Sequence, residues 1–508
     1  IADTAAIADI ANTFLNNAAN IDPFAPNGFG GDINLQAKND IITSHLSSYG
    51  GAGSGDVNIT SSDGNINTGV IFSVSPQGNG GNITLKAPQG DITTSHINSY
   101  ATQNGSGGFV DISAGGDFNI GAATINSFSA NRSAIRSEGP IGGGNISITS
   151  GGEINTASGN LDSYSASGTA GNVTLNALLD IATSNIRSEG AQVGGDISII
   201  SDTGAITAAG NLNSFSQNGT AGDVTLDAAT GIDIANIRSE GAKVGGDISI
   251  ISDTGTITAP GNLNSFSQNG TAGDVTLDAA TGIDIANIRS EGAKVGGDIT
   301  VTTGGTFTSD TINSYATDAT TGEAGNVTLS ATGNITLGGD ATNSAIRSEG
   351  SQVGGDISII SDTGTITAAG NLNSFSQNGT AGDVTLDAAT GIDIANIRSE
   401  GAKVGGDISI ISDTGTITAP GNLNSFSQNG TAGDVTLDAA TGIDIANIRS
   451  EGAKVGGDIT VTTGGTFTSD TINSYATTAT TGEAGDVNIT AEGNITLGGD
   501  ANNSAIRS

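Results

Sequence analysis

The side chains best suited to catalysis in this sequence are two histidines, His45 and His96. They occupy matching stretches, Thr43-Ser-His-Leu-Ser-Ser-Tyr49 and Thr94-Ser-His-Ile-Asn-Ser-Tyr100. A Ser–His relay also needs a group that orients the imidazole, and neither stretch carries a distinctive acid. The chain has no cysteine, which excludes thiol nucleophiles and thiolate metal sites. We therefore expect surface or stacked histidines, no catalytic residue and no enzyme.

Acidic residues offer a second kind of chemistry, cation binding. The chain has 51 acids against 15 bases and a net charge of −36, which argues against nucleic acid or an anionic membrane surface as a partner. The Gly-Gly-x-Gly-x-Asp pattern of calcium-binding rolls is absent. We expect solvated acids with diffuse cation screening, weak or non-specific Ca²⁺ binding at most, and no metal site or cofactor.

Aromatic residues form a regular series and are the candidate binding residues. Most follow Ser in a [Leu/Ile]-x-Ser-[Phe/Tyr] frame, and alternation from Leu212 and Ser214 places Phe215 outward. Glu240 fills the matching position in the next rung, with Arg238 beside it. Exposed rings at this spacing could stack on sugars, pack against a second copy of the chain, or simply shield a corner. The candidate edge comprises Phe215, Phe266, Tyr315, Phe375, Phe426 and Tyr475.

Internal repeats indicate which elements must position these residues. Ile-Arg-Ser begins at Ile135, Ile186, Ile237, Ile288, Ile346, Ile397, Ile448 and Ile506. Three successive intervals make a super-repeat that occurs twice, as 186–345 and again from 346. We predict an irregular rung or cap over 1–20, divergent rungs over 21–185, and super-repeats over 186–345 and 346–508. The start at Ile1, without Met or leader, leads us to expect a removed signal or an excerpt of a longer protein.

Between successive Ile-Arg-Ser copies, a Gly-[Asp/Asn]-[Val/Ile] start occurs twice, as at Asp247 and Asp274 between Ile237 and Ile288. Strict alternation of apolar and polar residues, as in Asp247-Ile-Ser-Ile-Ile-Ser252, predicts strands with one buried face. Three short strands and three turns in about 25 residues match one rung of a β-solenoid. We predict an all-β fold, a single elongated right-handed parallel β-helix with about 24–27 residues per rung and roughly 18–20 rungs.

The repeat Gly-Gly-[Asp/Asn]-Ile-x-[Ile/Leu], followed by Gly-x-Ile-x-[Thr/Ala] and [Leu/Ile]-x-Ser-[Phe/Tyr], resembles the filamentous-haemagglutinin-like large exoproteins of two-partner secretion. Gly80-Gly-Asn-Ile-Thr-Leu85 reads most like cyanobacterial versions. The resemblance covers about residues 21–508 and implies export through an outer-membrane transporter and a role in adhesion. The chain departs from the family in lacking an Asn-Pro-Asn-Leu-type secretion motif, which leaves the export route open.

Two classes of function follow. The leading one is a secreted, extracellular or cell-surface structural fibre or adhesin, whose partners are copies of itself and surface glycans. The alternative is a carbohydrate-binding or polysaccharide-processing β-helix, for which residues 129–144 are the place to look because they belong to an unusually long rung. No run of 18 apolar residues occurs, so we expect no membrane span.

Overall fold

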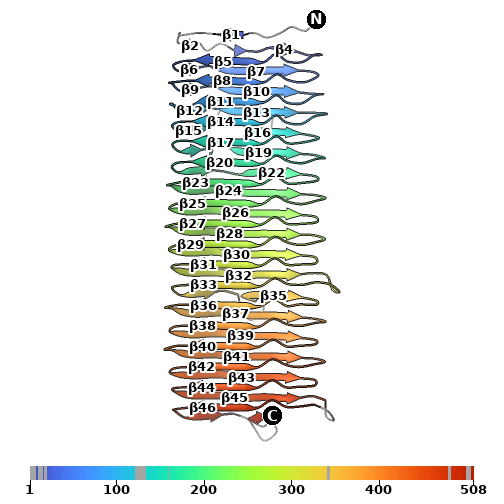
Figure 1. Cartoon of the computed structure of the whole chain (residues 1–508), viewed down its shortest axis with the longest axis vertical. Coiled ribbons are helices and arrows are strands. Elements are labelled where there is room, and N and C mark those ends of the chain that lie inside the picture. Colours follow the sequence, from blue (N-terminus) through green and yellow to red (C-terminus); the bar gives the residue numbers. More distant parts are fainter. Residues whose placement is uncertain are drawn as a thin grey trace. The chain divides into compact units, whose positions relative to one another are not determined.

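In a computed structural model of the chain, the described residues form strands joined by bends and corners, with no helix. The structure describes residues 7–9, 15–16, 20–120, 133–157, 159–339, 344–478, 482–498 and 505–508. Two compact units divide the chain, Ile1–Ala259 and Pro260–Ser508. Each is a parallel β-solenoid, and together they comprise about 17 rungs of about 26 residues (Figure 1), which confirms the predicted fold class.

The first unit contains two sets of parallel strands. The first set is β1 (Ile7–Asp9), β5 (Ile33–Ala37), β8 (Val57–Ser61), β11 (Ile83–Ala87), β14 (Val110–Ala114), β17 (Ile146–Ser150), β20 (Val173–Ala177), β23 (Ile197–Ser201), β25 (Val224–Ala228) and β27 (Ile248–Ser252). The second set is β2 (Leu15–Asn16), β3 (Asn20–Ile21), β4 (Phe24–Ala25), β6 (Ile41–Ile42), β7 (His45–Gly50), β9 (Ile66–Asn67), β10 (Val70–Ser75), β12 (Ile92–Thr94), β13 (His96–Ala101), β15 (Phe118–Ile120), β16 (Ser133–Gly139), β18 (Ile154–Asn155), β19 (Asn160–Ser165), β21 (Ile181–Thr183), β22 (Ile186–Gly190), β24 (Ala205–Ser216) and β26 (Gly231–Gly241).

The second unit repeats this plan, after β28 (Thr256–Ser267), which begins in the first unit. Its first set is β29 (Val275–Ala279), β31 (Ile299–Thr303), β33 (Val327–Ala331), β36 (Ile357–Ser361), β38 (Val384–Ala388), β40 (Ile408–Ser412), β42 (Val435–Ala439), β44 (Ile459–Thr463) and β46 (Val487–Ala491). Its second set is β30 (Gly282–Gly292), β32 (Thr306–Ala316), β34 (Ile335–Leu337), β35 (Ile346–Gly350), β37 (Thr365–Ser376), β39 (Gly391–Gly401), β41 (Thr416–Ser427), β43 (Gly442–Gly452), β45 (Thr466–Ala476), β47 (Ile495–Leu497) and β48 (Ile506–Arg507).

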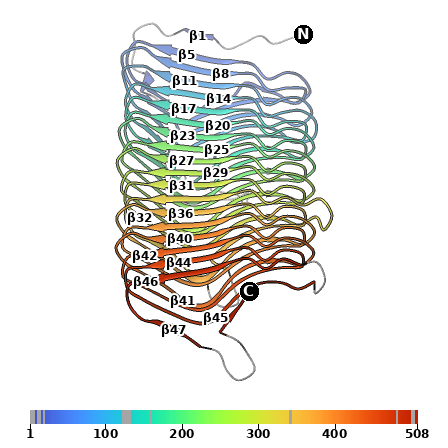
Figure 2. The same cartoon turned by 60° about the horizontal axis from the view of Figure 1, so that its bottom comes forward.

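The interior of each unit is built from aliphatic columns, because in-register parallel pairing places like residues on like. Ile199 pairs with Leu226 and Leu226 with Ile250, and all three side chains are fully buried. Figure 2 shows how successive windings lie over one another around this shared interior. Burying each such side chain stabilises the fold by roughly 1.5–3 kcal/mol. The alternating pattern in the sequence therefore predicted correctly which residues face inward.

A buried serine explains the glycine that immediately precedes each rung start. Ser239 Oγ donates a hydrogen bond to the Gly222 carbonyl at 2.8 Å and accepts one from the Gly246 N–H at 2.9 Å. A Cβ on Gly246 would lie 2.3 Å from the Gly222 oxygen, so no larger residue fits. The hydroxyl thus satisfies two backbone groups that the tight corner would otherwise bury unpaired. Serine thus bridges the glycine backbone of two rungs.

The Asp or Asn at each rung start forms a second ladder, on the outer surface. The backbone N–H of Asp223 donates to Asp196 Oδ1 at 3.0 Å, and that of Asp247 to Asp223 Oδ1 at 2.8 Å. A third ladder joins asparagine side chains, with Asn236 Nδ2 3.0 Å from Asn211 Oδ1, as the recurrence of asparagine predicted. Because Asp and Asn both offer this acceptor oxygen, the two residue types are interchangeable at the start position.

Rung length alternates because successive rungs differ by one residue at each of three corners. Ile197 pairs with Val224 and Val224 with Ile248, so the rung that starts at Asp196 is longer than the rung that starts at Asp223. One extra residue lies in a bulge between Ala208 and Asn211, where β24 bends without leaving its partner. The super-repeats therefore mostly have two strands per rung instead of the predicted three.

Proline is accommodated at the same kind of bulge in the second unit. Pro420 lies inside β41, between Ala419 and Asn422, where the register shifts, and it does not end the strand. A bulge leaves the ladder locally unpaired, so the missing proline N–H costs no hydrogen bond there. The equivalent Pro260 likewise lies inside a continuous strand, β28.

The region 1–20 is described only in part. Ile7 pairs with Asn34 and Leu15 with Ile41, both in parallel register. We expected an irregular rung or a cap over 1–20, and the remainder of this region lies outside the described residues.

Candidate functional site

An outward stripe of arginine, glutamate and aromatic residues runs along the second set of strands in each unit, and we call it the Arg–Glu–aromatic stripe. In the first unit it comprises Tyr100, Arg136, Glu138, Tyr164, Arg187, Glu189, Phe215, Arg238 and Glu240. In the second unit it comprises Phe266, Arg289, Glu291, Tyr315, Arg347, Glu349, Phe375, Arg398, Glu400, Phe426, Arg449, Glu451, Tyr475 and Arg507.

Aromatic rings and glutamates alternate in this stripe from rung to rung. Phe375 pairs with Glu400, and Glu400 pairs with Phe426. This alternation was predicted from the positions of Phe215 and Glu240, and their pairing confirms it. It follows from the two-rung repeat, because like positions recur every second rung.

Each arginine of the stripe except Arg507 makes two contacts at once. Arg398 Nε lies 2.7 Å from Glu400 Oε2 on its own strand, and its guanidinium lies 4.3 Å from the Phe375 ring of the preceding rung. Residues two apart on a strand share a face, which is why Ile-Arg-Ser-Glu produces this pair. Seven such Arg–Glu pairs and eight Arg–ring contacts recur among the described residues.

Burial of the carboxylates sets the electrostatics of the stripe. The Glu400 side chain is only 15% exposed, whereas its partner Arg398 is 41% exposed. The hydrogen bond to Glu240 outweighs desolvation and raises the pKa of Arg238, and Glu349 acts on the pKa of Arg347 in the same way. The stripe is thus a column of ion pairs with little net charge, set into an acidic surface.

The predicted binding residues are where we expected them but are less open. Phe215, Phe266, Tyr315, Phe375, Phe426 and Tyr475 all point outward and all are half-buried. An arginine of the following rung covers one face of each ring. From the sequence, Arg238 was expected beside the aromatic edge, but its cation–π contact was not predicted. Whether an arginine reaches a ring in the preceding rung depends on its rotamer.

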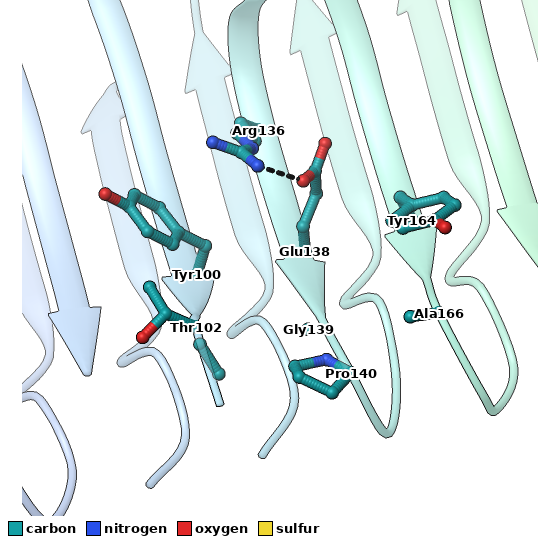
Figure 3. Close-up of a pocket in the computed structure, with 9 residues that line it drawn as sticks. Tyr100, Thr102, Arg136, Glu138, Gly139, Pro140, Tyr164 and Ala166 are labelled. Carbon is teal, nitrogen blue, oxygen red and sulfur yellow. Dashed lines mark ion pairs between the residues drawn. The ribbon is translucent and has the colours of Figure 1, made fainter. Parts of the chain in front are cut away.

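A hollow of about 330 Å³ interrupts the stripe in the first unit. Tyr100 of β13 and Tyr164 of β19 form its sides, and the ion pair of Arg136 and Glu138 lies between them on β16 (Figure 3). Thr102, Pro140 and Ala166 line the corner end. Glu138 Oε2 lies 2.5 Å from the Arg136 guanidinium, and the Glu138 residue is 7% exposed. Part of this hollow falls in the 129–144 stretch that the sequence singled out, of which 129–132 lie outside the described residues.

The other candidates are separated from this hollow. His45 and His96 each pair with Val70, on opposite sides, so the two imidazoles are two rungs apart and do not stack. His45 instead meets Phe72 edge-on, with ring centroids 5.4 Å apart. Within the described ranges, no group of three or more His, Asp or Glu residues is arranged to hold a metal ion.

Comparison with known proteins gives no relative for this chain. No protein-family model, no curated protein and no solved structure matches it. In the part of the chain that the structure describes, no helix is long and apolar enough to cross a membrane. The properties established for this protein are therefore its repeat pattern and its parallel β-solenoid fold.

Proposed function

We propose that this protein is a secreted structural fibre or adhesin, which acts outside the cell as a repetitive surface. One observation carries the proposal: the same Arg–Glu–aromatic set recurs every second rung in both units. A residue set repeated in this way forms an array, whereas an active site is singular. We accordingly propose that the protein is not an enzyme and needs no cofactor.

Stacking supports a mechanical role for such an array. Each interior strand is paired on both sides, so every added rung extends the hydrogen-bonded ladder through the same kind of contacts. The partners we propose are copies of the same chain, surface glycans and an outer-membrane transporter for export; the last rests on the resemblance to two-partner-secretion exoproteins. The strongly acidic surface, with a net charge of −36, disfavours nucleic acid as a partner.

Negative-stain electron microscopy and sedimentation velocity of the intact chain test the proposal. We expect extended particles, and higher sedimentation coefficients at higher concentration where copies associate. Particles that are compact and show no extension would contradict it.

The second candidate function is glycan binding or processing, and the hollow between Tyr100 and Tyr164 favours it. Incubation with polygalacturonate separates processing from a structural role. We expect no release of reducing ends, and measurable turnover would favour the enzyme.

A further inference from the structure

We propose that the hollow between Tyr100 and Tyr164 binds one sugar ring of a neutral glycan, with Tyr164 as the stacking platform. This site would give the proposed adhesin a specific ligand. Its biological use rests on the proposed function, whereas its ability to bind a sugar does not. The glycan class follows from the aromatic ring, the local side chains and the charge of the site.

Tyr164 lines the hollow on the side that arginine does not cover. Arg187, from the following rung, covers one side of the ring at 4.3 Å. Glu138 pairs with Tyr164 from the preceding rung, and both residues line the hollow. Arg136 lies 4.8 Å from the Tyr100 ring on the opposite side. We infer that a flat ligand in the hollow would reach Tyr164 beside Glu138, from the side opposite to Arg187.

Local sequence differences open the hollow here. Ala166 is the second residue after Tyr164, where the rungs with phenylalanine carry a glutamine: Gln217, Gln268, Gln377 and Gln428. Pro140 replaces the alanine or serine that follows Glu-Gly in the other rungs, such as Ala242. Ala166 lines the hollow, so a glutamine at this position would place a longer side chain at the same site.

Two tyrosines flank Glu138, an arrangement without a second instance among the described rungs. Every other glutamate of the stripe has a phenylalanine beside it, either as its paired residue or under its arginine partner. Tyr100, Tyr164 and Thr102, three residues that carry a hydroxyl group, line this one hollow. A sugar, which combines an apolar C–H face with a rim of hydroxyls, matches an aromatic platform edged with polar groups.

The charge of the site favours a neutral ligand. Arg136 and Glu138 are the charged residues that line the hollow, and their ion pair leaves no net charge there. Arg187, behind Tyr164, is balanced by Glu189 at 2.9 Å, and Asp162 adds a negative charge on the strand between the two arginines. No unpaired cation is therefore left among these residues to hold an acidic sugar, and the net charge of −36 repels acidic polysaccharides further.

The size of the hollow limits what it can hold. Its volume of about 330 Å³ lies at the lower end of ligand pockets, about 300–1,000 Å³, which suits a single ring of a longer chain. The remaining rings of a glycan would lie along the outer surface, where neighbouring rungs present other outward side chains.

The test is binding of neutral and acidic oligosaccharides to the intact chain, by saturation-transfer NMR and calorimetry. The probes are hexasaccharides of α-1,4-glucose, β-1,4-glucose and β-1,4-mannose, with oligogalacturonate as the acidic comparison. We expect at least one neutral probe to bind at one site per chain. Ala166→Gln, which installs the side chain found in other rungs, and Tyr164→Ala should each weaken this binding at least tenfold.

A matched variant in a regular rung provides the control. Gln217→Ala should change the affinity less than twofold, and circular dichroism should show that Ala166→Gln keeps the wild-type fold. Absence of binding by all neutral probes overturns the inference, as does preference for oligogalacturonate, or binding at many sites that Ala166→Gln leaves unchanged. A variant that alters self-association but not sugar binding would assign the hollow to contacts between copies. None of these results bears on particle extension, so the inference and the proposed function fail separately.

Discussion

At the scale of single residues, the stripe depends on a carboxylate that is nearly buried beside an arginine that is not. Glu400 lies between the rings of Phe375 and Phe426, and Arg398 supplies its counter-charge. The arginine also covers Phe375, so one side chain serves a carboxylate and a ring. Loss of the arginine therefore removes two interactions at once.

We predict that Arg398→Gln destabilises its rung by about 1–3 kcal/mol, because it leaves Glu400 without a counter-charge. The value lies below that of a fully buried pair because Arg398 is 41% exposed. The Arg398→Gln, Glu400→Gln double variant should recover at least half of the loss. Native-state hydrogen exchange over β39 measures both. A double variant no more stable than Arg398→Gln alone would show that the ion pair contributes little.

At the scale of the strand and its corner, the buried serine and the Gly-Gly pair act as one unit. Ser399 Oγ donates to the Gly382 carbonyl at 2.8 Å and accepts from the Gly406 N–H at 2.9 Å. A Cβ on Gly406 would meet the Gly382 oxygen at 2.3 Å. This corner is consequently specified by backbone contact between rungs as well as by local turn preference.

We predict that Ser399→Ala lowers the local free energy of unfolding by about 1–3 kcal/mol, because it leaves a buried carbonyl and a buried N–H without a hydrogen-bond partner. Ser409→Ala, on the outward side of β40, is the control and should be near neutral. Hydrogen exchange of the amides from 382 to 406 reports the difference. Equal exchange in the two variants would contradict the assignment of the hydroxyl as a bridge.

The sequence predicted much at this scale because alternation and register are local properties. Inward positions such as Ile250, and the pairing of Phe215 with Glu240, follow from period two and the repeat length. The merging of two strands at Ala208 did not follow, because a bulge and a turn have similar local residues and differ in pairing with the next rung. From the sequence, only residues 129–144 could be singled out, because the hollow is also lined by Ala166, which belongs to a different rung.

At the scale of the whole molecule, accumulated negative charge opposes folding. Burial raises the pKa of Asp227, and the charges of Asp253 and Asp202 add to it; burial acts in the same way on Asp387, with Asp413 and Asp362. Burial also raises the pKa of Asp223, where the charges of Asp247 and Asp196 contribute while the Asp247 N–H lowers it. Asp318 is the exception, since hydrogen bonds from Thr320 and Thr321 lower its pKa to about 2.

A carboxyl whose pKa is raised by folding is destabilising when ionised, so its penalty is full above the folded pKa and disappears below the unfolded value near 3.8. We predict that the urea midpoint rises as the pH falls from about 7.5 through the raised pKa values towards about 4. It should also rise at about pH 7.5 when NaCl increases from about 0.02 M to about 0.5 M, because salt screens surface repulsion. A midpoint that falls under both changes would show that attractive pairs dominate.

The alternation of ring and glutamate imposes a parity on the length of this protein. An odd insertion or deletion of rungs would place two carboxylates, or two rings, face to face at the junction. Each interval between Ile-Arg-Ser copies advances the chain by two rungs, and the duplicated super-repeat, which contains three intervals, advances it by six. Unequal recombination between the near-identical copies therefore lengthens or shortens the molecule only in even steps, and every product keeps its charges and rings in phase.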